Sequence, residues 1–97
     1  MRSALLLLLT SGAMLAQAPT FAPPVRLKAG DKFLGERRYF PSPVYYDLNG
    51  DGRLDIVVGD LGGNMTVALR RAGPGIAFEA ETPVNGADGN PLKFDNW

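Results

Sequence analysis

Five residues in one short stretch have the types and spacing of a cation-binding loop. Asp47, Asn49, Asp51 and Asp55 carry side-chain oxygens at positions 1, 3, 5 and 9, and Arg53 at position 7 would contribute its backbone carbonyl. Hard divalent cations such as calcium take about six to eight oxygen ligands at short range. Three carboxylates this close also repel one another unless a cation lies among them. The spacing therefore predicts a preassembled calcium site, with the Arg53 side chain pointing away from the ion.

Two glycines alternate with the oxygen-bearing residues. Gly52 is at position 6, where calcium loops need a sharp turn, and Gly50 is two residues before it. The alternative is an acidic turn that binds nothing, because Asn-Gly and Asp-Gly are common turn dipeptides. We favour the metal site, since a turn alone does not require four spaced oxygens.

The flanking residues indicate which kind of calcium loop to expect. Position 12, where an EF-hand has a bidentate glutamate, is Val58. The runs 44–46 and 56–58 consist of β-branched and aromatic residues, which favour strands. Pro41 and Pro43 also disfavour an entering helix. The loop is therefore expected between two β-strands.

Residues 43–60 closely resemble the core of an FG-GAP/VCBS-type repeat, the β-propeller blade of integrin α-chains and of many secreted bacterial proteins. In that family a loop of the form Asp-x-Asx-x-Asp-Gly-x-x-Asp joins the first two strands of a blade and holds calcium. The resemblance covers about residues 41–79 and matches every side-chain ligand position. It implies an all-β fold, a single antiparallel four-stranded β-propeller blade, in which calcium is bound by Asp47, Asn49, Asp51, Arg53 and Asp55.

Hydrophobic patterning elsewhere is also typical of a small β unit. No segment shows a sustained helical period, and glycine-rich or proline-rich turns separate the apolar runs. After a lead-in with one candidate strand at 25–28, the expected blade strands are 44–47, 55–59, 65–70 and 76–80.

The predicted organisation has four parts. Residues 1–18 are a signal peptide and residues 19–40 an extended lead-in. A short Phe-to-Pro-Val similarity with the end of the blade suggests that this lead-in is the tail of a preceding blade, although chance explains it equally well. Residues 41–80 form the calcium-binding blade, and residues 81–97 an irregular C-terminal segment.

A propeller needs about four to eight blades, and a lone repeat cannot bury its hydrophobic faces. We therefore expect a fragment of, or building block for, a multi-blade propeller.

The N-terminus predicts secretion. Arg2 precedes an apolar run over residues 4–16, and Ala16-Gln17-Ala18 is a small-x-small cleavage site. The run is too short for a membrane span, so none is expected in the mature form, although an uncleaved anchor is the alternative. The protein would be extracellular or periplasmic.

Loss of Arg2 from ten basic and ten acidic residues leaves a nearly neutral chain, which does not indicate nucleic-acid binding.

Catalytic residues are scarce. Without His or Cys, the chain lacks the usual general base, thiolate nucleophile and zinc ligands, so no enzyme activity is expected. Asp60 follows the calcium loop closely in sequence and is interpreted as a supporting acceptor or a turn residue rather than a catalytic carboxylate. Tyr45 and Tyr46 are expected in the core rather than stacked on a sugar. The pairs Arg37-Arg38 and Arg70-Arg71 are expected to be solvated.

Two functions from different classes are consistent with these features. The first is a secreted calcium-binding propeller module with structural calcium and a role in binding or adhesion. Its partner would be an unknown protein or carbohydrate, further blades, or copies of itself. The alternative is the N-terminal fragment of a larger secreted enzyme containing a propeller, such as a polysaccharide-degrading one, whose catalytic residues lie outside this chain.

Overall fold

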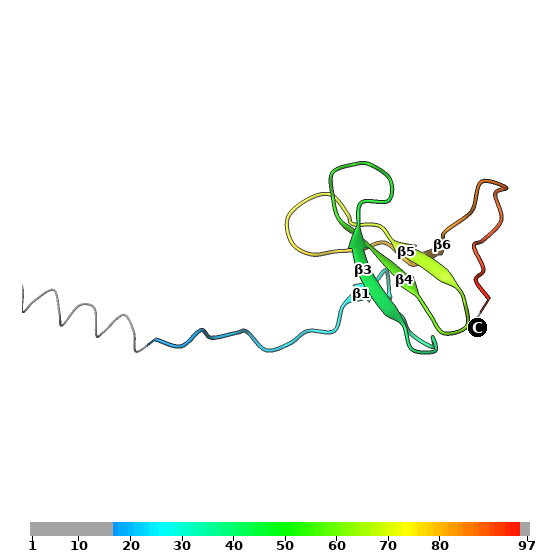
Figure 1. Ribbon diagram of the computed structural model, residues 1–97. Coiled ribbons are helices and arrows are strands. Elements are labelled where there is room, and N and C mark those ends of the chain that lie inside the picture. Colours follow the sequence, from blue (N-terminus) through cyan, green and yellow to red (C-terminus); the bar gives the residue numbers. More distant parts are fainter. Residues whose placement is uncertain (1–16, 96–97) are drawn as a thin grey trace, which may run out of the picture.

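The computed structural model describes residues 17–95, which form two antiparallel β-sheets and no helix (Figure 1). The all-β expectation is thus confirmed, whereas the predicted signal peptide lies almost entirely outside the described residues. Within those residues, no helix is long and apolar enough to cross a membrane. The smaller sheet pairs β1 (Lys28–Ala29) with β2 (Lys32–Phe33). The larger is a four-stranded meander of β3 (Ser42–Tyr46), β4 (Asp55–Gly59), β5 (Met65–Ala68) and β6 (Thr82–Pro83).

The central strands were predicted well and the outer ones less well. β4 has the predicted bounds, β3 begins two residues early, and β5 is shorter than expected. The fourth strand is not at 76–80, because Phe78 makes only a single bridge to Arg70 and is instead buried in the core. Thr82 and Pro83 pair with β5 in its place. Pro83 is tolerated there because an edge strand leaves one side without a hydrogen-bonding partner.

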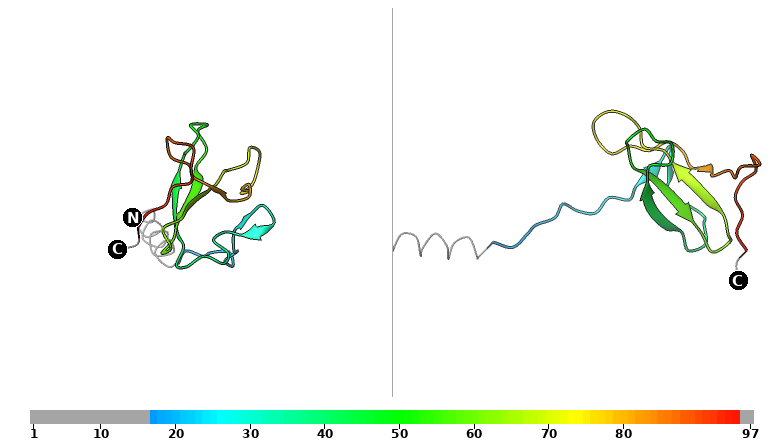
Figure 2. Two further views of the ribbon diagram at one scale, coloured as in Figure 1. Left: turned by 90° about the vertical axis from the view of Figure 1, so that its right-hand side faces the viewer. Right: turned by 45° about the horizontal axis from the view of Figure 1, so that its top comes forward.

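The main hydrophobic cluster lies on one face of the larger sheet, while Val57 and Val67 are buried on the opposite face. Alternate residues of a strand point to the same face, so Ile56 and Val58 of β4 lie on one face, beside Ala68 of β5. The β1–β2 hairpin lies to one side of this sheet (Figure 2), and Ala29 from the hairpin and Phe78 from the segment after β5 cover that face. The predicted strand at 25–28 is replaced by β1, which overlaps it at Lys28 alone.

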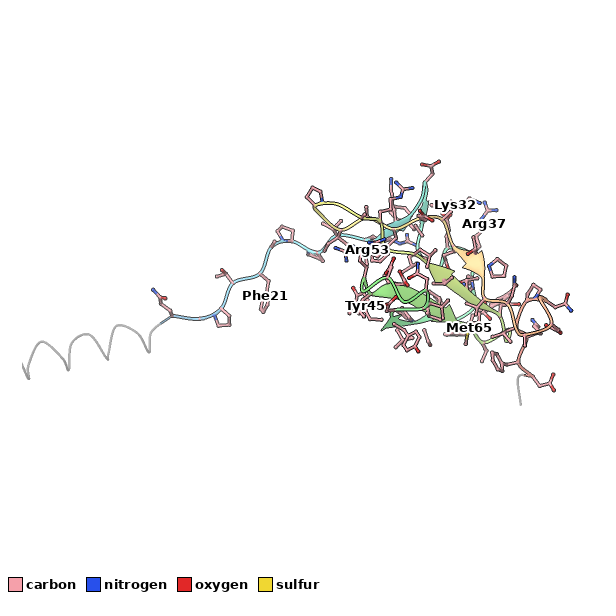
Figure 3. All side chains as sticks on the ribbon, turned by 90° about the horizontal axis from the view of Figure 1, so that it is seen from above. Phe21, Lys32, Arg37, Tyr45, Arg53 and Met65 are labelled. Carbon is pink, nitrogen blue, oxygen red and sulfur yellow. The ribbon has the colours of Figure 1, made fainter. Side chains whose placement is uncertain are left out.

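The lead-in therefore covers the sheet that follows it in sequence. Ile56 and Val58 are only 3% and 1% exposed, so they are not left half-covered as a lone sheet would leave them. Before the hairpin the chain is extended and exposed, and Phe21 lies on this extended part, away from the sheet (Figure 3).

Strand β3 is the exposed edge of the sheet. Tyr45 and Tyr46 are 59% and 60% exposed, and Val44 is 59% exposed. The expectation that both tyrosines belong to the core is therefore wrong. Within residues 17–95, β3 pairs with β4 alone. On the face of Tyr45, the hairpin leaves an apolar hollow lined by Leu27 and Leu34, and Tyr46 points to the opposite face.

Arg38 joins the lead-in to the larger sheet. Its Nε donates to Asp60 Oδ2 at 2.7 Å and its Nη1 to Glu81 Oε1 at 3.0 Å, while Nη2 donates to the Val58 carbonyl at 3.1 Å. Nη1 also contacts the Thr66 hydroxyl, which donates to Glu81 Oε1 at 2.7 Å. The side chain is only 13% exposed, so the prediction that Arg38 is solvated is wrong.

The C-terminal segment is more ordered than expected. It bridges Asn85 to Pro91 and returns to the β4–β5 turn, where Lys93 bridges Asn64. Phe94 then donates its N–H to the Gly63 carbonyl at 2.8 Å. A Cβ at Gly63 would lie 1.9 Å from the Phe94 carbonyl oxygen, so this crossing requires glycine.

We expect Gly63→Ala to detach this segment from the turn. Gly75→Ala is the matched control, because Gly63 and Gly75 have φ of 84° and 83° but a Cβ at Gly75 meets no atom within 4 Å. Both variants should lose about 1–2 kcal/mol of folding stability, because a residue with a Cβ is disfavoured in the left-handed backbone conformation. Only Gly63→Ala should also speed amide exchange at Phe94. Thermal melts and hydrogen exchange check this; equal effects in the two variants would contradict it.

Candidate metal-binding loop

The loop that carries the predicted ligands joins β3 to β4, as the sequence indicated. Tyr46 pairs with Asp55 at its base. Gly50 and Gly52 have φ of 73° and 83°, and an added Cβ at either would meet nothing within 4 Å. These glycines are therefore needed for backbone conformation rather than for close packing.

Asp47 organises the first half of the loop. Its Oδ1 accepts hydrogen bonds from the N–H groups of Gly50 at 2.9 Å and Asp51 at 3.2 Å, and its Oδ2 accepts from Gly52 at 2.8 Å. Asn49 Oδ1 accepts from the Asp51 N–H at 3.3 Å. The oxygens of Asp47 and Asn49 are thus directed at the loop's own backbone.

Asp51 pairs with the residue that was predicted to point away. Its Oδ1 accepts the Arg53 N–H at 2.9 Å, and its Oδ2 forms an ion pair with Arg53 Nη2 at 2.8 Å. The backbone hydrogen bond from Arg53 is the main reason that the pKa of Asp51 is lowered. The prediction for the Arg53 side chain is therefore wrong, because the guanidinium folds back onto a neighbouring carboxylate.

Asp55 is fully buried, with an exposed fraction of 0%. Its Oδ2 accepts the Leu48 N–H at 3.0 Å and its Oδ1 accepts the Arg70 N–H at 2.8 Å. A buried carboxylate is tolerated when backbone donors satisfy it. Asp55 therefore connects the start of the loop to the residues that follow β5.

The predicted ligands have the right chemistry for calcium but are not gathered around one point. Among residues 17–95, no three or more acidic, His or Cys side chains are placed together as a metal-binding group. Each carboxylate has about four acceptor positions, so the hydrogen bonds described leave capacity for a cation. The all-oxygen donor set fits a hard ion. The acidic ligands are not grouped and Asp51 is already paired with Arg53, so the site is not preassembled as expected.

Asp60 lies at the opposite end of β4 from this loop. A strand rises about 3.3 Å per residue, so Asp60 is roughly 16 Å from Asp55, and Figure 3 shows Arg53 and Met65 at these two ends. Of the two alternatives for Asp60, support of the metal site is wrong, whereas its role as a turn residue is confirmed, because its Oδ1 accepts the Asn64 N–H at 2.9 Å in the turn after β4. The Arg38 side chain, followed by the Asn64 N–H, lowers its pKa from 3.8 to about 2.

Sequence reasoning missed the cluster of Arg38, Asp60 and Glu81. These residues are far apart in the chain, and no local motif connects them. Comparisons with protein-family models, curated proteins and solved structures find no match. The resemblance to FG-GAP/VCBS repeats thus depends on the loop motif and the strands around it.

The lowered pKa of Asp60 predicts a pH dependence of stability. Because the folded-state pKa is depressed, the stabilisation is complete above pH 3.8 and is lost as the pH falls toward about 2. Asp60→Asn should lower the melting temperature at pH 6 by at least about 5 °C. The difference from the parent protein should shrink over that acidic range. Thermal melts of both proteins from pH 2 to pH 6 measure this difference in melting temperature.

Asp31→Asn is the control, since the exposed Asp31 carboxylate makes no hydrogen bond or ion pair with any described residue. A pH-independent difference between Asp60→Asn and the parent protein would contradict the assignment of this carboxylate as a charged partner of Arg38.

Proposed function

We propose that this protein is a secreted calcium-binding β-repeat module of the FG-GAP/VCBS type, in which calcium has a structural role. The observation that supports the proposal is the position of the oxygen-rich loop: it connects two antiparallel strands, with glycines in the left-handed conformation at Gly50 and Gly52. The loop belongs to a four-stranded antiparallel meander, and propeller blades are four-stranded sheets.

Calcium would bind the side chains of Asp47, Asn49, Asp51 and Asp55 and the carbonyl of Arg53. Its charge would replace the Arg53 guanidinium as the partner of Asp51. An ion that binds only the folded form stabilises it, by about 1.4 kcal/mol at ten times the dissociation constant. Extracellular calcium loops commonly have dissociation constants of about 0.1–1 mM, which suits a secreted protein.

The exposed edge strand is consistent with a role in binding. β3 leaves Val44, Tyr45 and Tyr46 uncovered, and an unpaired strand edge is able to accept another strand. A module of this kind would act by binding or adhesion, to further blades or to a protein or carbohydrate partner.

Asp51→Ala should abolish calcium binding, because it removes a carboxylate from the middle of the loop. Asp88→Ala is the matched control: Asp88 Oδ1 accepts the Asn90 N–H at 3.0 Å, as Asp51 accepts that of Arg53, but in a separate turn. Calorimetric titration with calcium measures both affinities. Equal affinity in the two variants would overturn the site.

Arg53→Gln should bind calcium more tightly than the parent protein, by about twofold to fivefold. The substitution keeps the backbone carbonyl ligand and removes the exposed ion pair with Asp51, which solvent weakens. The same titration measures this difference in affinity. In thermal melts, calcium should raise the melting temperature of Arg53→Gln more than that of the parent protein, relative to chelator. Weaker binding by Arg53→Gln would show that the guanidinium supports the loop instead of competing with the ion.

A further inference from the structure

Three arginines gather around one surface hollow beside the loop. The hollow has a volume of about 280 Å³ and is lined by Arg53, Arg70 and Arg71 together with Leu54 and Gly73. None of its lining residues within 17–95 is acidic. Like charges repel at short range, so an anion bound in the hollow would relieve the repulsion among these guanidinium groups.

Two of the guanidinium groups are held in place by neighbouring atoms. Arg53 Nε donates to the Arg70 carbonyl at 3.3 Å, and its Nη2 pairs with Asp51. Arg70 Nη2 donates to the Gly75 carbonyl at 2.9 Å, and its Cζ lies 5.4 Å from the centre of the Phe78 ring. A guanidinium has five N–H donors, so each group keeps donors for a ligand.

The third arginine and Gly73 also line the hollow. Arg71 is exposed, and its side chain makes no hydrogen bond or ion pair within residues 17–95. Its own N–H donates to the Ala77 carbonyl at 2.8 Å, which fixes the base of the glycine-containing turn. The Gly73 N–H donates to no acceptor in the described part of the chain.

We propose that this hollow binds a doubly charged tetrahedral oxyanion, the chemistry shared by free sulfate or phosphate and by a phosphate monoester. Among residues 17–95, Arg53 is the one arginine of the three that forms an ion pair, with Asp51, so the guanidinium groups of Arg70 and Arg71 are available to such an anion. Planar guanidinium groups bind oxyanions through paired, charge-assisted hydrogen bonds. Leu54 supplies an apolar wall for whatever carries the anion.

Anion binding at the hollow does not require calcium in the oxygen-rich loop, so the proposal is tested in the presence of chelator. The amide signals of Arg71 and Gly73 are followed by NMR while sodium sulfate is added to the protein, and again with sodium chloride at equal ionic strength. We expect saturable shifts with sulfate and none with chloride. Shifts that are the same for both salts, or that do not saturate, would overturn the site.

Arg71→Gln should weaken sulfate binding by about tenfold, the effect of losing one charged hydrogen-bond partner. Arg37→Gln makes the same charge change on the turn between β2 and β3 (Figure 3), and it should leave the affinity unchanged. An equal loss of sulfate affinity in both variants would show that only the net charge of the protein matters, and it would refute the proposal.

A comparison of inorganic phosphate with glucose 6-phosphate then distinguishes the two sources of the anion. Tighter binding of the sugar phosphate would show that the hollow takes an oxyanion carried on a larger molecule and that Leu54 contacts the carrier. Equal affinity would show that it takes the free ion. Binding of neither one would contradict the site.

Discussion

The rest of the structure depends on the two hydrogen bonds that the buried Asp55 carboxylate accepts. Its two oxygens accept N–H groups from Leu48 and Arg70, two residues that belong to different loops. An unsatisfied buried carboxylate would be costly, so these contacts are required for β4 to be buried at its first residue. They fix both the oxygen-rich loop and the arginine-lined turn at one end of the sheet, and the two proposed binding sites are neighbours for this reason.

Strand β4 separates two polar clusters with different roles. At its far end, Arg38 compensates Asp60 and Glu81 and attaches the lead-in to the sheet. The attached lead-in places the β1–β2 hairpin over the face that carries Ile56 and Val58, together with Phe78. The hydrophobic cluster is thus covered by Ala29, which precedes the larger sheet in sequence, and by Phe78, which follows β5. Within the described part of the chain, the edge strand β3 is left exposed at Val44, Tyr45 and Tyr46.

Arg53 is shared by the two proposed sites. Its guanidinium contacts Asp51 in the oxygen-rich loop and the Arg70 carbonyl beside the hollow. A calcium ion that takes Asp51 as a ligand would free that guanidinium for an anion, so the two ligands would favour each other's binding through this one side chain. Binding at linked sites is reciprocal, and an anion at the hollow would therefore raise calcium affinity.

The sequence by itself determined the local features of this protein. The all-β class, the bounds of β4 and the position of the loop follow from β-branched runs and from Asn-Gly and Asp-Gly turns, which act over a few residues. Tertiary structure decided the roles of Arg38, Arg53 and Asp60, and the replacement of the strand at 76–80 by β6. Those outcomes depend on which charged groups and which apolar faces meet after the chain has turned. Such contacts join residues that are distant in sequence, and no local pattern records them.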